Sequence, residues 1–343
     1  MSGTKLRVVA LVHRHLVPPE KVEEGTDITA APWRTEYDVV STLTGVGHEV
    51  QVLPVHDDLG EIRRLATEWK PHIAFNLLEA FDDIVIFDQN VVSHLELLKL
   101  PYTGCNPRGL LLARDKSLSK KLLAYHRLPV PEFEVFRAGR PIRRPKRLQF
   151  PLIVKSLTQE ASIGISQASV VDNDDKLKER VAFIHQSIGT AAIVEQYIEG
   201  RELYVGVMGN QNLQALPVWE LFFTNMPEGA KRIATDRVKW SVKYQKKYGI
   251  DSGPARDLSE EKAAEIQHLC KRAYRALELS GYARIDLRLD EAGNVWVLEA
   301  NPNPQIAKGE DFAASAEKLG MGYDAVLQRI INLGLRWQPE SVA

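Results

Sequence analysis

The sequence predicts an α/β protein in which an N-terminal parallel-sheet domain is followed by two smaller α+β domains. Three observations support this prediction. The chain has 343 residues, more than one compact core usually accommodates. Strand-like and helix-like segments alternate over its first third, which is typical of βαβ units and a parallel sheet. Hairpins and short strands replace this alternation farther on, and we expect domains at 1–106, 107–192 and 193–343.

The first domain is expected to contain three strands and three helices. The hydrophobic patterns place strands at 6–12, 49–54 and 73–77 and helices at 33–46, 59–70 and 88–99. The first strand contains Arg7 and is followed by His13-Arg14-His15, so it is too short and too polar for a signal peptide or a membrane span. A turn-rich segment at 101–107 closes the domain.

The two later domains mix helices with short strands. In the middle domain we expect helices near 115–127 and 173–187 and strands at 132–136, 151–155, 163–171 and 191–195. In the last domain we expect a hairpin around Gly209-Asn210, a long polar loop at 222–254, a helix at 259–279, a hairpin over 282–300 and a helix near 323–333. A loop of that length is uncommon inside a compact domain, so we interpret it as a functional lid.

Composition narrows the range of partners and the cellular compartment. The net charge of −1 gives no general attraction to nucleic acid or to an anionic membrane, and we expect neither as a partner. The two cysteines, Cys105 and Cys270, are far apart and belong to no paired motif. This usage argues against a disulfide framework and fits a reducing cytoplasm.

The hairpin over 282–301 carries the most specific chemistry. Two alternating runs flank Ala292-Gly293, which we expect to form a two-residue turn. In that register Asp286 lies directly opposite Glu299, and paired Cβ atoms in such a sheet are roughly 4.5–5.5 Å apart. Two carboxylates so close repel each other and need a compensating cation.

Magnesium is the natural candidate for that cation, because it prefers oxygen ligands and usually binds one or two carboxylates together with phosphates. The side-chain oxygen of Asn301, predicted to lie opposite Arg284, would complete a cluster with Asp286 and Glu299. The alternative is a surface hairpin in which Arg284 and Arg288 neutralise the acids. On this stretch alone both interpretations stay open.

The hairpin also carries a resemblance to a known family. The run from Arg284-Ile285-Asp286 to Leu298-Glu299-Ala300-Asn301-Pro302 resembles the C-terminal metal motif of D-alanine–D-alanine ligases and other ATP-grasp enzymes. Segments similar to the family's nucleotide-binding motifs precede it in the same order, at 109–116, at 150–155 with 162–166, and at 194–202. The resemblance covers roughly residues 100–335, and the N-terminal domain matches only in architecture. It implies an ATP-grasp fold, in which the two α+β domains clamp ATP.

The resemblance also implies ligands for ATP. Lys116 and Lys155 would place ammonium groups on the α- and β-phosphates, which must be neutralised in phosphoryl transfer. Glu195 and Ile198 would meet the edge of the adenine, and Glu202 would accept hydrogen bonds from the ribose hydroxyls. The metal would be Mg²⁺, for which Mn²⁺ could substitute.

The activity implied is an ATP-dependent ligation of a carboxylate to an amine through an acyl phosphate. Arg284, beside the metal ligands, would stabilise the oxyanion formed when the amine attacks. Ser162, in the phosphate loop at 162–166, is a further candidate catalytic residue. Basic residues interleaved with aromatic residues between 231 and 247 could form a nucleic-acid groove. The ATP-grasp motifs favour a lid instead, with Lys243 near the γ-phosphate.

Departures from the family pattern predict an amino-acid substrate other than a pair of D-alanines. The pair Ala161-Ser162 stands where those ligases carry two serines, and residues 75–83 and 303–309 replace a histidine–glycine loop and a serine- and glycine-rich loop. The candidates for substrate contacts share a charged or phenolic group near these segments or in the lid. They are Glu36 and Glu79 for an ammonium group, Lys308 for a carboxylate, and Tyr244.

Three functions remain distinguishable. The first is a small-molecule amide or dipeptide ligase acting on a carboxylate and an amine, and the second is an enzyme that adds an amino acid to a peptide or protein tail. The third is a nucleotide-binding protein without catalysis, against which the intact motif residues argue. By analogy with the family, a homodimer is expected.

Overall fold

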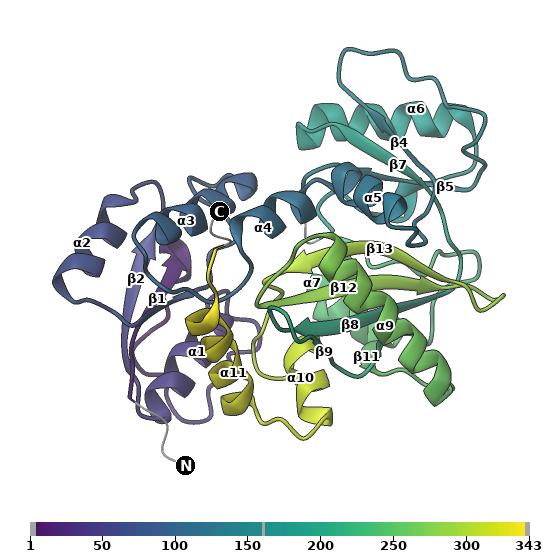
Figure 1. The fold of residues 1–343 in the computed structure, drawn as a ribbon. Helices are drawn as coiled ribbons and strands as arrows, with labels where there is room; N and C mark the ends of the chain where they lie inside the picture. The colour runs from purple at the N-terminus through teal and green to yellow at the C-terminus, as the bar shows by residue number, and fades with distance from the viewer. Residues whose placement is uncertain (1–4, 160–161, 340–343) are drawn as a thin grey trace.

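The computed structural model describes residues 5–159 and 162–339, and these form three sheets (Figure 1). The first sheet consists of β1 (Arg7–His13), β2 (Glu49–Val55) and β3 (Ile73–Asn76) in the order β2-β1-β3. Both strand pairings are parallel, with Val8 beside Val50 on one side and Ile73 on the other. The predicted parallel N-terminal sheet is therefore confirmed.

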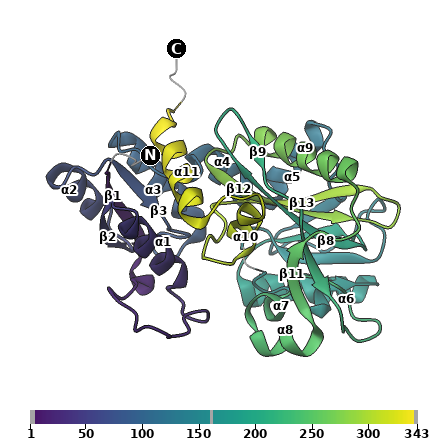
Figure 2. The same ribbon diagram turned by 90° about the horizontal axis from the view of Figure 1, so that it is seen from below.

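Helices α1 (Arg34–Gly45) and α2 (Gly60–Glu68) connect these strands, and α3 (Asp88–Leu97) comes after β3. The short 3₁₀ helices η1 (Arg14–Leu16) and η2 (Val85–Phe87) follow β1 and β3. The C-terminal helix α11 (Tyr323–Arg336) also packs on this sheet (Figure 2). Its apolar side chains share one buried cluster with those of the sheet: Val326, Leu327, Ile330 and Ile331 with Val8, Ile73 and Phe75.

The segment predicted as a turn near residue 107 begins a helix. Helix α4 (Pro107–Arg114) starts there because the Asn106 side chain accepts a hydrogen bond from the Gly109 N–H and Pro107 occupies the first helical position. Asp115 then leaves the helical conformation and caps α5 (Lys116–Tyr125). The helix predicted near 115–127 is therefore α5, α4 was not predicted, and the junction between the two helices positions Lys116.

The second sheet is antiparallel, in the order β4-β7-β5-β6, with β4 (Phe133–Phe136), β5 (Leu152–Ser156), β6 (Val170–Val171) and β7 (Ala192–Gln196). Helix α6 (Asp174–Phe183), extended by the π-helical η4 (Ile184–Ile188), packs against it. The prediction of a strand at 163–171 was wrong for residues 163–169. Only β6 is a strand, because Ser162 and Gly164 adopt positive φ angles and the 3₁₀ helix η3 (Gln167–Ser169) follows.

The third sheet, also antiparallel, runs in the order β11-β10-β8-β12-β13, with β9 (Gln214–Ala215) paired to β8. Its strands are β8 (Arg201–Met208), β10 (Trp219–Phe223), β11 (Ile250–Pro254), β12 (Tyr282–Leu289) and β13 (Val295–Pro302). Helix α9 (Glu260–Ala276) was predicted, whereas the short helix α10 (Asp311–Lys318) was not.

The segment 222–254, which we call the lid segment, is not a structureless loop. It contains the end of β10, helices α7 (Asp236–Trp240) and α8 (Val242–Tyr248), and strand β11. The hydroxyls of Thr235 and Ser241 accept hydrogen bonds from backbone N–H groups in the first turns of the two helices. The polar composition that predicted a loop therefore supplies helix caps.

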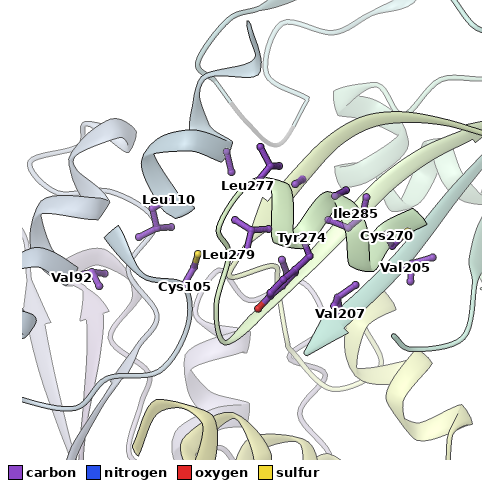
Figure 3. Close-up of a cluster of buried hydrophobic side chains, with 14 of the residues drawn as sticks. Val92, Cys105, Leu110, Val205, Val207, Cys270, Tyr274, Leu277, Leu279 and Ile285 are labelled. Atoms are coloured by element: carbon purple, nitrogen blue, oxygen red, sulfur yellow. The ribbon is translucent and has the colours of Figure 1, made fainter. Parts of the chain in front are cut away.

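A buried apolar cluster joins the first domain to the third sheet (Figure 3). Cys105 and Leu110 lie beside Leu279 and Tyr274, whose hydroxyl donates a 2.8 Å hydrogen bond to the Gly209 carbonyl. Both cysteines are buried and unpaired. Among the residues that the structure describes, no helix combines the length and the hydropathy needed to cross a bilayer.

Candidate active site

A pocket with about 790 Å³ of empty space lies between the second and third sheets. Many of the residues singled out in the sequence line it, namely Lys116, Lys155, Ser162, Glu195, Ile198, Glu202, Asp286 and Glu299. The fold therefore brings together side chains that are far apart in the chain.

Lys116 reaches the pocket from the first turn of α5. Its Nζ donates a 2.6 Å hydrogen bond to the Gln159 carbonyl and lies 4.0 Å from Oε2 of Glu299. Burial lowers the pKa of Lys116, although the Glu299 carboxylate opposes this shift. Burial makes the charged form of Lys116 costly. An anion bound beside its ammonium group would reduce that cost, so this position favours anion binding.

Glu195 holds two lysines, Lys155 in the pocket lining and the buried Lys120. Its Oε2 lies 3.1 Å from Nζ of Lys155 and 3.5 Å from Nζ of Lys120. Burial alone would raise the pKa of Glu195, but the two ammonium groups outweigh it and lower that pKa. Lys120 also donates a 2.7 Å hydrogen bond to the carbonyl of Leu298. Glu195 thus fixes the position of Lys155.

Asp286 and Glu299 face each other across β12 and β13, as the sequence predicted. Asp286 is also held by Arg284, which donates hydrogen bonds of 2.7 and 2.9 Å to its two oxygens. Burial would raise the pKa of Glu299, but Lys116, Lys155 and Lys239 lower it to about 2. Burial and the nearby Glu299 raise the pKa of Asp286 against the opposing effect of Arg284. Glu299 is therefore the firmly ionised member of the pair.

The chemistry of these donors fits a magnesium ion. Asp286 and Glu299 supply carboxylate oxygens, and Asn301 follows two positions after Glu299 on β13. The Nδ2 atom of Asn301 is buried and has no hydrogen-bond partner among the described residues. Hard oxygen donors of this kind suit Mg²⁺ or Mn²⁺.

Part of the pocket lining forms an apolar slot. Ile153, Tyr197 and Ile233 pack together there, from the second sheet and the lid segment. The neighbouring Glu202 is buried. Its two carboxylate oxygens accept hydrogen bonds from Arg288 at 2.7 Å and from the Tyr204 hydroxyl at 3.0 Å. The slot offers a flat apolar surface beside a fixed acid.

The lid segment is docked on the phosphate loop. The Ser162 hydroxyl donates a 2.7 Å hydrogen bond to the Ala234 carbonyl. The side-chain amide of Gln167 makes two hydrogen bonds with the backbone of Lys231. It donates to the carbonyl at 2.9 Å and accepts from the N–H at 2.8 Å. Arg288 donates to the Arg232 carbonyl at 2.6 Å. These contacts close one side of the pocket.

Several predicted site residues do not line this pocket. Arg284 stacks over the Tyr204 ring with its guanidinium carbon 4.7 Å from the centroid, and Asn301 lies opposite it. Lys243 is exposed on α8, and the Tyr244 ring packs on Tyr248 at 4.5 Å between centroids. In the same segment it is Lys239 that lines the pocket.

Three of the four candidate substrate residues, Glu36, Glu79 and Lys308, lie in the first domain or against it, whereas Tyr244 lies in the lid segment. Glu36 is buried in the first turn of α1, where burial raises its pKa to about 7, and Glu79 is exposed in the loop after β3. Lys308 is exposed, but its backbone N–H donates to Asp38 of α1 at 2.9 Å. Helix α1 and the loop after β13 are therefore directly joined. Ala161 lies outside the described residues.

Sequence reasoning missed the roles of three charged residues, of which Lys239 and Arg288 line the pocket and Lys120 contacts Glu195. Lys120 lies in a basic helix, where a lysine is usually solvated, and no local pattern marked it. Lys239 lies four positions before Lys243 in a stretch already singled out, so the segment was found but not the residue. Arg288 was placed on the face of Asp286 but was considered only as a charge that neutralises the acids, whereas it lines the pocket and donates a hydrogen bond to Glu202.

Comparisons with known proteins identify relatives of this chain. Residues 122–332 match the family model described as D-ala D-ala ligase C-terminus. The D-alanine–D-alanine ligase of Bordetella petrii is 34% identical over 252 residues, which are 71% of each chain. An uncharacterized protein of Sinorhizobium fredii is 29% identical over 315 residues, or 89% of each chain. The crystal structure of D-alanine–D-alanine ligase from Bacillus anthracis complexed with ATP has a TM-score of 0.74 at 21% identity, and covers 97% of this chain and 98% of that one.

The fold is that of the ATP-grasp ligases, with two antiparallel-sheet domains enclosing the pocket. The chain belongs to the D-alanine–D-alanine ligase family, whose model matches well over half of it.

Proposed function

We propose that this protein joins a carboxylate to an amine in an ATP-dependent reaction that proceeds through an acyl phosphate. The observation that carries the proposal is the convergence of Lys116, Lys155 and Lys239 on the Asp286–Glu299 pair in one pocket. Ammonium groups there can neutralise phosphate oxygens, and paired carboxylates can hold the metal ion that such phosphates also bind.

We assign the nucleotide base to the apolar slot beside Ile198, and the ribose to Glu202. In this assignment Glu195 is more than an edge contact for the adenine, since its carboxylate holds Lys120 and Lys155. Lys116 and Lys155 then face the α- and β-phosphates. Lys239, and not the exposed Lys243, faces the γ-phosphate.

In the first step, an oxygen of the substrate carboxylate attacks the γ-phosphorus, the bond to the β–γ bridging oxygen breaks, and ADP leaves. Lys239 remains beside the transferred group and offsets its charge, while Lys116 and Lys155 offset the charge that develops on the departing ADP. A magnesium ion held by Asp286, Glu299 and Asn301 would supply further charge neutralisation and orient the phosphates. The docked lid segment would keep water away from the acyl phosphate.

In the second step, the amine nitrogen attacks the acyl carbon, releases a proton, and displaces phosphate. Arg284 is the candidate that stabilises the oxyanion, and its bidentate contact with Asp286 holds the guanidinium in place. Ser162, whose hydroxyl donates to Ala234, would act mainly by holding the lid segment on the phosphate loop.

We further propose that the substrates are small molecules that include an amino acid other than a pair of D-alanines. Glu36 is an unpartnered buried acid suited to an ammonium group: among the described residues, its Oε2 has no hydrogen-bond partner. Glu79, Lys308 and Tyr244 are weaker candidates, because all three are at least partly exposed. On the resemblance alone, we expect a homodimer in the cytoplasm.

The test is ADP release from MgATP, screened against pairs of amino acids, other carboxylates and short peptides. We expect release with a small-molecule pair and little release with D-alanine alone. Turnover on D-alanine at the rate of the Bordetella petrii ligase would overturn the substrate proposal only. If no carboxylate–amine pair and no peptide releases ADP, the ligase proposal itself is wrong.

A further inference from the structure

A histidine and aspartate cluster lies in the first domain, outside the pocket described above. It gathers at the carboxyl edge of the parallel sheet. His13 ends β1, His56 directly follows β2, and Asp82 and Asp83 lie in the loop after β3. In open α/β sheets this edge is where ligands bind, since loops from neighbouring strands converge there.

The spacing of the donor atoms suits one metal ion. Nε2 of His13 lies 3.2 Å from Oδ1 of Asp83, and Nδ1 of His56 lies 3.9 Å from the same oxygen. Zinc bonds to nitrogen and oxygen are about 2.0–2.2 Å long, so ligand atoms in a tetrahedral site lie roughly 3.3 Å apart. The cluster therefore needs only small side-chain movements to enclose an ion.

His56 provides a second, independent indication. Its side chain is 10% exposed, and its Nδ1 is buried without a hydrogen-bond partner among the described residues. Buried polar atoms are nearly always satisfied, so an unpartnered imidazole nitrogen between two aspartates requires an explanation. A metal ion bound at Nδ1 would satisfy it.

The other ring nitrogen of His56 is placed to support that role. Its Nε2 lies 4.0 Å from Oδ1 of Asp82. Histidine ligands commonly donate their second ring N–H to a carboxylate, which fixes the ring. For His13, ligation through Nε2 would place the proton on Nδ1. It would give up only the long 3.4 Å contact from the His15 N–H.

We propose that His13, His56 and Asp83 bind a divalent transition-metal ion of the zinc class, with a fourth position open to solvent or substrate. Imidazole donors favour such ions over the magnesium expected at the oxygen-only cluster of Asp286 and Glu299. The ion would fasten the loop after β3 to the ends of β1 and β2. That loop also carries Glu79 and holds Asp82 and Asp83 at φ angles of 53° and 56°.

The experiment is a titration of the tag-free, metal-stripped chain with Co²⁺, followed by visible absorption and by calorimetry. We expect one site with the intense absorption of tetrahedral nitrogen-containing coordination, and displacement of Co²⁺ by Zn²⁺. His56→Ala and Asp83→Asn should each weaken binding at least tenfold. Because Asp83 is 69% exposed, its variant tests the site even if His56→Ala fails to fold.

Two control variants separate this site from other sources of binding. His268→Ala removes an exposed histidine on α9, and Glu299→Gln alters the magnesium cluster; neither should change the absorption. The proposal is overturned if Co²⁺ does not bind, if binding survives unchanged in Asp83→Asn, or if Glu299→Gln abolishes it. In those cases the cluster is a set of histidine–aspartate ion pairs.

Discussion

Glu299 lies directly opposite Asp286 although the loop between their strands is longer than a two-residue turn. Asp290 and Asn294 close the loop, with Gly293 in the left-handed region at φ +82°. A bulge at Leu298 then restores the register, so that Leu287 pairs with Val297 but Asp286 pairs with Glu299. The bulge frees the Leu298 carbonyl, which accepts the hydrogen bond from Lys120. The bulge at Leu298 therefore determines both the pairing of the two carboxylates and the position of the buried Lys120.

Replacing Glu299 with Gln should remove most ATP turnover while leaving the fold intact. The amide keeps the shape of the side chain but loses the negative charge that a magnesium ion requires. Because such an ion contributes several kcal/mol in the transition state, we expect a loss of about a hundredfold or more in kcat. The measurement is steady-state ADP release at several magnesium concentrations.

Glu291→Gln is the matched control for that variant. Glu291 is exposed at the tip of the same hairpin, so its loss of charge should leave ADP release unchanged. Near wild-type turnover by Glu299→Gln would contradict the metal assignment.

Lys239→Ala and Lys243→Ala should differ sharply. Lys239 lines the pocket and lowers the pKa of Glu299, whereas Lys243 is exposed on the next helix. Loss of a preorganised positive group costs on the order of a hundredfold in kcat, so we expect that effect for Lys239→Ala. Lys243→Ala, an exposed change, should alter kcat by less than about threefold. The measurement is kcat of the two variants and the wild type at saturating ATP. A larger loss in Lys243→Ala would return the γ-phosphate role to that residue.

Sequence reasoning could find the carboxylate pair because a strand alternates with period two. The predicted two-residue turn at Ala292-Gly293 was wrong, and the pairing holds because the bulge at Leu298 compensates for the longer loop. Sequence reasoning could also find the parallel sheet, since the alternation of strands and helices is local. It could not rank Lys239 above Lys243. Their difference arises at Ser241, where the backbone leaves the helical conformation and separates α7 from α8.

The burial of charged side chains could not be predicted from the sequence either. Lys120 belongs to a helix whose basic residues resemble a solvated face. It becomes buried because Glu195 of β7 and Leu298 of β13 approach it from distant parts of the chain. The candidate metal cluster in the first domain has the same character, since His13, His56 and Asp83 meet only when three parallel strands are aligned.

Gln167→Ala should loosen the lid segment. The Gln167 amide makes two hydrogen bonds with the backbone of Lys231, and losing them should cost roughly 1 kcal/mol, about a fivefold shift toward an open state. Trypsin should then cleave the free variant faster than the wild type within 222–254. MgATP with substrate should protect both proteins. Gln211→Ala, exposed on another hairpin, should cleave like the wild type. Equal wild-type cleavage rates with and without ligands would argue against a gating role.

Glu36→Gln should stabilise the free protein at alkaline pH and weaken substrate binding. The pKa of Glu36 is about 7, above its usual 4.5, because the carboxyl is buried. The folded state therefore holds the proton more tightly than the unfolded state does. The contribution of Glu36 to stability is full below pH 4.5 and is lost as the pH rises to about 7. A shift of this size corresponds to at most about 3 kcal/mol. Glutamine stays neutral, so in denaturant unfolding the Glu36→Gln variant should match the stability of the wild type near pH 4 and exceed it at pH 8.

Glu49→Gln, at an exposed position on β2, should show no such pH-dependent difference. If the stability difference between Glu36→Gln and the wild type is the same at both pH values, Glu36 is not a buried acid that titrates near neutrality. Its assignment to the substrate ammonium group would then lose its physical basis.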